Sequence, residues 1–331
     1  KMNIQILDCT LRDGSHINNG KFGKEKIRQI ITGLIEANID IIEVGLLQNH
    51  QCGVDFSIFN SIDFVDQCLS IIEKKNSKFS LMLRTDRVDF NKLAKSPKVD
   101  FIRIALYQEH LNDIKRYGEK AKELGYEIIF NPIAITKYSP NEIQFLIKTL
   151  EELKPYGISL VDTFGSFTLN EFEKVLKIFD ENLSPNITLG IHLHQNLNLA
   201  LSLAAKATKL IINRDLIIDS SLSGMGRVPG NLQSELFANY LNQNFNHQYN
   251  IEKLLSLTAL IEEFKILNRW GYNPIYMYSA SLNIDRTYPE FFEKMGFCIE
   301  NNLNLQKICK EKGIGSKFNE EEARKIINSY N

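Results

Sequence analysis

The feature that most constrains this sequence is a regular alternation of short β-branched apolar runs with longer amphipathic stretches, continuing to about residue 245. The stretch 24–38, for example, repeats apolar residues at helical spacing between Ile27 and Ile35. Eight strands, each followed by a helix, predict a (β/α)8 TIM barrel of the α/β class. A doubly wound open sheet is the alternative, because periodicity does not show closure. The predicted strands are 3–8, 41–44, 79–84, 101–105, 127–130, 159–162, 188–192 and 216–219.

The sequence predicts two domains without a flexible linker between them. Residues 1–245 form the expected catalytic barrel, and 246–331 are read as a mostly helical C-terminal extension packed on it. No Pro/Gly-rich segment or low-complexity block divides the chain.

Composition excludes several classes of function. With 39 basic and 40 acidic side chains, the formal net charge of −1 provides no field that would attract nucleic acid or anionic lipid. No apolar run reaches the roughly 18 residues of a membrane helix, so we expect a cytoplasmic protein without nucleic-acid or membrane partners. Five cysteines without CxxC spacing argue against a disulfide framework and against a thiolate zinc site. They are Cys9, Cys52, Cys68, Cys298 and Cys309.

Chemistry-bearing residues gather in three segments, each at the C-terminal end of a predicted strand. Residues 8–16 follow the first strand, 192–196 end the seventh, and 224–231 follow the eighth. In a closed barrel the eighth strand lies beside the first, so these segments converge at the face where barrel enzymes place their active sites.

The paired imidazoles suggest a metal site. His192 and His194 are two residues apart on a strand, so they share a face with Cα atoms about 6.5–7 Å apart. Asp13 adds a carboxylate and Asn231 an amide oxygen. This donor set suits Mn²⁺ or Mg²⁺ better than Zn²⁺, Fe²⁺ or Co²⁺. The alternative for the histidine pair alone is two hydrogen-bonded core histidines.

Other polar residues near these segments suggest roles in acid–base chemistry and anion binding. Arg12 could stabilise an enolate oxygen or hold a carboxylate, with Glu43 as its ion-pair partner. His16, at the barrel mouth, could transfer protons or could be a solvated loop histidine. Arg84 and Arg103 could bind an acidic substrate, and ion pairs inside the barrel explain them equally well.

Three motifs together resemble the DRE-TIM metallolyase superfamily over roughly residues 3–245. They are Asp8-x-Thr-Leu-Arg-Asp-Gly14, the pair His192/His194 and Gly230-Asn231. The superfamily includes 4-hydroxy-2-oxoacid aldolases, 3-hydroxy-3-methylglutaryl-CoA lyase, and isopropylmalate and homocitrate synthases. His16 occupies a position where the synthases and the CoA lyase usually carry glutamine, so this chain resembles the pyruvate-class aldolases, such as 4-hydroxy-2-oxovalerate aldolase.

The resemblance implies roles for the site residues. Asp13, His192 and His194 would bind a divalent metal, with Mn²⁺ first and Mg²⁺, Co²⁺ or Zn²⁺ possible, and Asn231 matches a further ligand position. Arg12 would steady a pyruvate enolate, and His16 would be the catalytic base. The implied reaction is cleavage or formation of a 4-hydroxy-2-oxoacid from pyruvate and an aldehyde.

The C-terminal region departs from the familiar degradative aldolases, which work with an acylating aldehyde dehydrogenase. Residues 270–278 and 285–288 match those enzymes poorly, so a dehydrogenase partner is not expected. They are more similar to aldolase-domain proteins of surface-polysaccharide and sugar pathways, which implies a polar or sugar-like aldehyde. Tyr276, Tyr278 and Tyr288 either reach the barrel mouth or pack within the tail, and we take Tyr288 as a substrate-contact or supporting residue.

Two alternative functions stay open at this stage. One is a Claisen-type enzyme that condenses an acyl-CoA with a 2-oxoacid, which His16 in place of glutamine disfavours. The other is a non-catalytic barrel scaffold, which the intact set of motif residues disfavours. A homo-oligomer is compatible with the sequence. The loop 224–231 could bind a carboxylate or phosphate through its backbone N–H groups.

Overall fold

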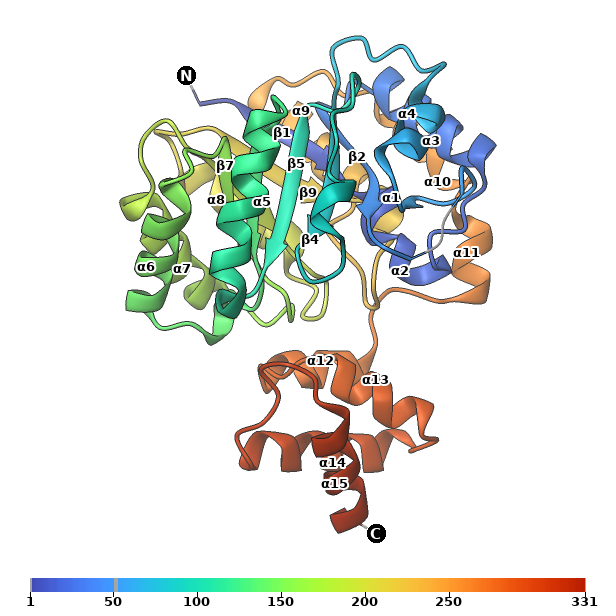
Figure 1. Cartoon of the computed structure of the whole chain (residues 1–331). Coiled ribbons are helices and arrows are strands. Elements are labelled where there is room, and N and C mark those ends of the chain that lie inside the picture. The colour runs from blue at the N-terminus through green and yellow to red at the C-terminus, as the bar shows by residue number, and fades with distance from the viewer. Residues whose placement is uncertain (1, 51–52, 331) are drawn as a thin grey trace.

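The computed structural model describes residues 2–50 and 53–330 and shows a closed parallel barrel followed by a group of helices (Figure 1). Strand β1 also pairs with β2, through Leu7 with Ile41 and Asp8 with Ile42. This pairing closes the sheet, confirms the TIM barrel and excludes the open sheet. The barrel strands are β1 (Ile4–Asp8), β2 (Ile41–Leu47), β4 (Lys78–Arg84), β5 (Phe101–Leu106), β6 (Glu127–Pro132), β7 (Gly157–Val161), β8 (Thr188–His192) and β9 (Leu216–Ser220).

Helices between the strands cover the outside of the barrel. Their apolar faces bury against the sheet, as Ile27, Ile30, Ile31 and Leu34 of α3 do. Capping boxes at Ser139 and Thr168 start α6 and α7 by satisfying free backbone N–H groups. These helices are α3 (Lys24–Glu36), α4 (Ile62–Leu69), α5 (Leu111–Glu123), α6 (Pro140–Glu151), α7 (Leu169–Asn182), α8 (Ala200–Leu210) and α9 (Ser234–Phe245).

Two short helices and one short strand near the barrel mouth were not expected. α1 (Thr10–Asp13) and α2 (Ser15–Asn18) follow β1 directly. Strand β3 (Ile58–Phe59) pairs with β2 and lies just before α4 in the chain. Two residues of strand are too short to show a period of their own.

The inward-facing residues of the barrel form layers, because side chains alternate along each strand. An apolar layer near the N-terminal ends of the strands contains Leu7, Ile41, Phe101, Ile129 and Ile217. The next inward-facing layer is charged. Glu43, Arg103 and Asp219 come two residues after Ile41, Phe101 and Ile217 on the same strands, and each is at most 1% exposed. The centre of the barrel is therefore a buried layer of charge directly below the mouth.

The first two helices after residue 246 pack with the barrel core. Helices α10 (Ile251–Thr258) and α11 (Glu262–Leu267) belong to the barrel, because the apolar core of the barrel extends through Leu257 to Trp270. Leu257 packs directly over Gly33 of α3, where an added Cβ would lie 2.3 Å from Leu257 Cδ2. The separately packed part has its own small core and consists of α12 (Pro274–Ser281), α13 (Thr287–Lys294), α14 (Ile299–Glu311) and α15 (Glu320–Tyr330).

This C-terminal helical unit, α12 to α15, lies beyond the ends to which the strand arrows point (Figure 1). Asn196 Nδ2 donates to the carbonyl of Tyr276 at 3.1 Å, and Arg227 Nη2 donates to Glu290 Oε2 at 2.9 Å. Thr136 Oγ1 also donates to Asn283 Oδ1 at 2.9 Å. The unit thus packs on the loops that surround the barrel mouth.

Two predictions from composition concern the cysteines and membrane-spanning helices. Cys9, Cys68, Cys298 and Cys309 are free thiols, while Cys52 lies outside the described residues. Within residues 2–50 and 53–330, the structure has no helix with the length and apolarity needed to traverse a bilayer.

Candidate active site

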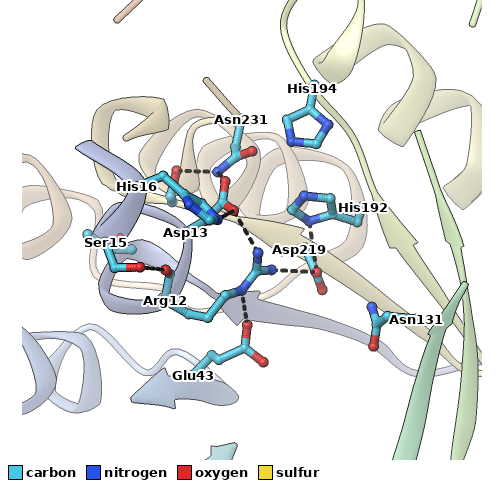
Figure 2. Close-up of polar contacts among 12 residues, drawn as sticks. Arg12, Asp13, Ser15, His16, Glu43, Asn131, His192, His194, Asp219 and Asn231 are labelled. Carbon is cyan, nitrogen blue, oxygen red and sulfur yellow. Dashed lines mark hydrogen bonds and ion pairs between the residues drawn. The ribbon is translucent and has the colours of Figure 1, made fainter. Parts of the chain in front are cut away.

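The three predicted segments meet at the barrel mouth (Figure 2). Asp13 comes from α1, His192 ends β8, and His194 lies two residues later. One ligand atom from each of these residues lies within 4.8 Å of the others, although the chain separates Asp13 from the histidines by most of the barrel. Closure of the sheet between β9 and β1 produces this proximity.

Hydrogen bonds orient both imidazole rings. His192 Nδ1 lies 2.9 Å from Asp219 Oδ2, and His194 Nδ1 lies 2.7 Å from the carbonyl oxygen of Asp162. Because both partners are acceptors, each Nδ1 carries the proton and each Nε2 keeps its lone pair for a metal ion. Burial and the neighbouring His192 lower the pKa of His194 to about 3, so its ring is neutral, as a ligand must be.

Asn231 completes the cluster. Its Nδ2 donates to Asp13 Oδ2 at 2.6 Å, while its Oδ1 is buried and has no hydrogen-bond partner among the described residues. A buried acceptor without a partner is costly unless something binds it. Gly226 makes room for this pair, because an added Cβ would lie 2.4 Å from Asn231 Nδ2 and 2.5 Å from Asp13 Oδ2. Two imidazoles, a carboxylate and a free amide oxygen fit a divalent cation.

A buried network of charges supports the cluster from below. Arg12 donates from Nε to Glu43 Oε1 and from Nη1 to Asp13 Oδ1, each at 2.6 Å. Arg103 binds both carboxylate oxygens of Glu43 at 3.1 and 3.0 Å, and its Nη2 donates to Asp219 Oδ2 at 2.5 Å. Glu43 therefore lies against Arg12, as expected. Arg103 forms interior ion pairs and does not line the mouth, which resolves its two possible roles.

The network keeps its members charged. Burial alone would raise the pKa of Asp13, but the guanidinium of Arg12 and the nearby histidines hold it well below the ordinary value for a carboxyl. Burial would likewise lower the pKa of Arg12, and Glu43 and Asp13 raise it instead. Asp13 is thus ionised even at low pH, as a metal ligand would need to be.

His16 faces a cavity of about 190 Å³ above this cluster. Its Nε2 lies 3.9 Å from Asp13 Oδ1, and 38% of its side chain remains exposed. Removal from bulk water, together with the positive charges of Arg227, Arg12 and Arg286, lowers the pKa of His16 below its ordinary value. The ring is therefore neutral near pH 7 and can accept a proton.

Tyr288 is the one predicted site residue that the structure places elsewhere. It is fully buried in the core of the C-terminal helical unit, where its ring packs against Phe318 at 5.1 Å between centroids. Its hydroxyl donates to Glu322 Oε2 at 3.2 Å. Tyr288, predicted to contact substrate or support the site, does not line the cavity in this structure, because α13 turns its apolar face toward α14 and α15.

Two important residues were missed by the sequence reasoning. Asp219 orients His192 and pairs with Arg103, and its signal was its place on the inward face of β9, two residues after Ile217. Arg286 lines the cavity from the C-terminal helical unit, and no local pattern in the sequence distinguishes it from an exposed arginine.

Comparisons with known proteins agree with this geometry. A 4-hydroxy-2-oxovalerate aldolase from Geobacillus genomosp. 3 is 26% identical over 246 residues, covering 73% of this chain and 72% of the relative. A second relative of that name, from Thermomicrobium roseum, is also 26% identical and covers 78% of this chain and 72% of its own length.

Solved structures show the same fold. The N-terminal domain of a candidate aldolase from Bacteroides vulgatus superposes with a TM-score of 0.76 at 25% identity, covering 89% of this chain and 98% of that one. The HMG-CoA lyase from Brucella melitensis has a TM-score of 0.66 at 15% identity, covering 80% of this chain and all (100%) of its own, and it shows the fold alone. The HMGL-like family profile matches residues 3–261, and the chain belongs to the HMGL-like family.

Proposed function

We propose that this protein is a divalent-metal-dependent aldolase that cleaves or forms a 4-hydroxy-2-oxoacid by way of a pyruvate enolate. The single observation that carries the proposal is the convergence of Asp13, His192 and His194 within 4.8 Å of one another, beside Arg12 and His16. The relatives named 4-hydroxy-2-oxovalerate aldolase support the same reaction class.

Asp13, His192 and His194 would hold the ion, with Asn231 Oδ1 as a further donor. Mn²⁺ ranks first because it accepts both imidazole and carboxylate ligands, while Mg²⁺, Co²⁺ and Zn²⁺ remain candidates. A bound divalent cation supplies Lewis acidity toward the 2-oxo and carboxylate oxygens of the substrate.

Arg12 is positioned to balance the negative charge that develops on the substrate. Its Nε and Nη1 are engaged by Glu43 and Asp13, which leaves the Nη2 group, 3.9 Å from Asp219 Oδ2, without a hydrogen bond to any described residue. Because Arg12 lines the cavity, this group can donate to the enolate oxygen. Glu43 and Asp13 keep the guanidinium in this orientation.

His16 provides the base. In the cleavage direction its neutral ring removes the proton of the 4-hydroxyl group, the C3–C4 bond breaks, and the aldehyde leaves with its new carbonyl. The electron pair of the broken bond enters the pyruvate enolate, which Arg12 stabilises until C3 takes up a proton. Condensation follows the same steps in reverse.

The test is exchange of the pyruvate methyl protons in D₂O with Mn²⁺, followed by proton NMR. Wild-type protein is expected to catalyse exchange, and Asp13→Asn is expected to lose it because an ionised ligand is gone. Retro-aldol cleavage should fall by about 10²–10⁴-fold in His16→Ala. The matched control is His247→Ala, whose ring stacks on Tyr249 away from the mouth.

Failure of wild-type exchange with Mn²⁺, Mg²⁺, Co²⁺ and Zn²⁺ alike would overturn the aldolase proposal. Release of free thiol from acetyl-CoA in the presence of a 2-oxoacid would instead favour the Claisen-type alternative. Full cleavage activity in His16→Ala would remove His16 from its role as the base.

A further inference from the structure

The barrel mouth carries more positive charge than enolate chemistry requires. Five arginine side chains line the cavity, whereas Asp13 is the only carboxylate among its described lining residues. Arg12 is already hydrogen-bonded to Glu43 and Asp13 in the buried charge network. The other four are Arg84, Arg87, Arg227 and Arg286.

Arg286 is the most unusual of the four, because it is buried over the ring of Tyr276, 5.5 Å from its centroid, without a hydrogen-bonded carboxylate among the described residues. Its side chain is 7% exposed, and its nearest carboxylate oxygen, on Glu290, lies 4.0 Å from Nη2. Both Nε and Nη1 are buried and have no hydrogen-bond partner among the described residues. Burial and the charge of Arg227 lower the pKa of Arg286 to about 9. Leaving a buried guanidinium unpaired is costly, so the arrangement favours an anion that enters the cavity.

The neighbouring arginines show which charges remain available. Arg227 donates to Glu290 at 2.9 Å, and Arg84 pairs with Asp86 at 2.7 Å. Within the described chain, no carboxylate oxygen lies within 4.0 Å of a side-chain nitrogen of Arg87. Arg286 has only the 4.0 Å contact with Glu290, a carboxylate that Arg227 and Lys294 already hold at 2.9 and 3.1 Å. Arg286 and Arg87 are therefore the least paired of these arginines.

These two arginines come from other elements than the candidate metal ligands Asp13, His192 and His194. Arg87 follows β4, and Arg286 directly precedes α13 of the C-terminal helical unit. The family match ends at residue 261, so Arg286 lies outside the part shared with the family profile. Its placement in the cavity depends on how this chain's own C-terminal helices pack over the mouth.

We propose that the aldehyde partner of the reaction carries an anionic group, a carboxylate or a phosphate, which Arg286 binds together with Arg87. The inference rests on the proposed aldolase function. In the proposed reaction the carboxylate of pyruvate would lie at Asp13, His192, His194 and Arg12, so the second anionic group would lie at the far end of the aldehyde. A guanidinium suits either group, because its paired N–H donors match two oxygens at once.

The experiment measures kcat/KM for condensation of pyruvate with four aldehydes, using the full chain loaded with Mn²⁺. Succinic semialdehyde is compared with butanal, and glyceraldehyde 3-phosphate with glyceraldehyde, so that the two arms distinguish carboxylate from phosphate. In at least one arm the anionic aldehyde should be preferred by about tenfold to a hundredfold, as expected for one charge-assisted contact of about 1.5–3 kcal/mol.

Substitutions then identify the side chain that causes the preference for the anionic aldehyde. Arg286→Gln should reduce the ratio between the anionic and the neutral aldehyde to near one, and Arg286→Lys should retain part of it. The matched control is Arg324→Gln, which removes an exposed arginine paired with Glu320 on α15 and should keep the ratio. Arg87→Gln changes an exposed side chain, so it reports on the same site even if Arg286→Gln fails to fold.

The outcomes separate this inference from the aldolase proposal. Wild-type protein that exchanges pyruvate protons but shows no preference in either arm overturns the inference and leaves the aldolase intact. A rise in the KM for pyruvate, rather than for the aldehyde, in Arg286→Gln also overturns it. If exchange is absent, calorimetric titration of the wild type and of Arg286→Gln with inorganic phosphate and with succinate tests the anion site. Binding to the wild type that is lost in Arg286→Gln supports the site. Equal binding to both proteins, or no binding to the wild type, overturns it.

Discussion

Replacing Asp219 by asparagine is expected to weaken both the fold and the metal site, because one carboxylate oxygen serves both. Asp219 Oδ2 accepts from Arg103 Nη2 at 2.5 Å and lies 2.9 Å from His192 Nδ1. Burial would raise the pKa of Asp219, but Arg103 and His192 hold it below the ordinary value, so the residue is charged in the folded protein. Asparagine keeps one acceptor and removes the charge.

The magnitude follows from the surrounding charges. Removing one partner of a buried ion pair costs about 3–5 kcal/mol, and Arg103 keeps Glu43 at 3.0 Å, so we expect about 3 kcal/mol. For a protein of 331 residues, whose unfolding entropy is about 0.7 kcal/mol/K, that corresponds to a fall in Tm of about 4 °C. Loss of the carboxylate that orients His192 should weaken metal binding by about 10–100-fold.

The assay combines thermal unfolding of the metal-free protein with calorimetric titration of Mn²⁺. Asp215→Asn is the matched control, since this exposed residue immediately precedes the same strand. Among the described residues, its carboxylate accepts only from the backbone N–H of Asn3. A Tm within about 2 °C of wild type, together with a Kd for Mn²⁺ within about threefold, would refute the idea that Asp219 supports the site.

Two further predictions concern packing and pH. Gly226→Ala should weaken Mn²⁺ binding in the same titration, because the new Cβ would displace Asn231 or Asp13, and unchanged affinity would contradict that packing. Arg227 lowers the pKa of Glu290 from 4.5 to about 2 against the opposing effect of burial, so stability from this pair is present above pH 4.5 and is lost as pH falls toward 2. Glu290→Gln should show a flatter decline in urea-unfolding free energy across that range; equal slopes would contradict this account.

Much of the site could be predicted from the sequence because its residues lie at the ends of strands. Asp13, His192, His194 and Asn231 all belong to segments at or just after the C-terminal ends of β1, β8 and β9. The C-terminal ends of parallel strands meet at one face of a barrel, so a correct strand assignment already places these segments together.

The start of the C-terminal extension and the role of Tyr288 could not be read from the sequence. Helical periodicity was correct for 251–267, but it does not show which neighbour a helix packs against. Leu257 packs on Gly33 and so joins the barrel, whereas Tyr288 joins the separate core of the C-terminal helical unit. Both outcomes depend on surfaces that meet only in the folded chain.

The sequence by itself determined the alternating elements, the residues proposed to bind metal and the family resemblance, since local hydrophobic period and short-range spacing encode them. Only the tertiary structure decided which charges are paired. Arg103 pairs with Glu43 and Asp219 inside the barrel, while Arg286 is buried at the mouth without a hydrogen-bonded carboxylate among the described residues. The two arginines are chemically identical, and the difference between them arises from long-range packing, which sets their partners and their access to water.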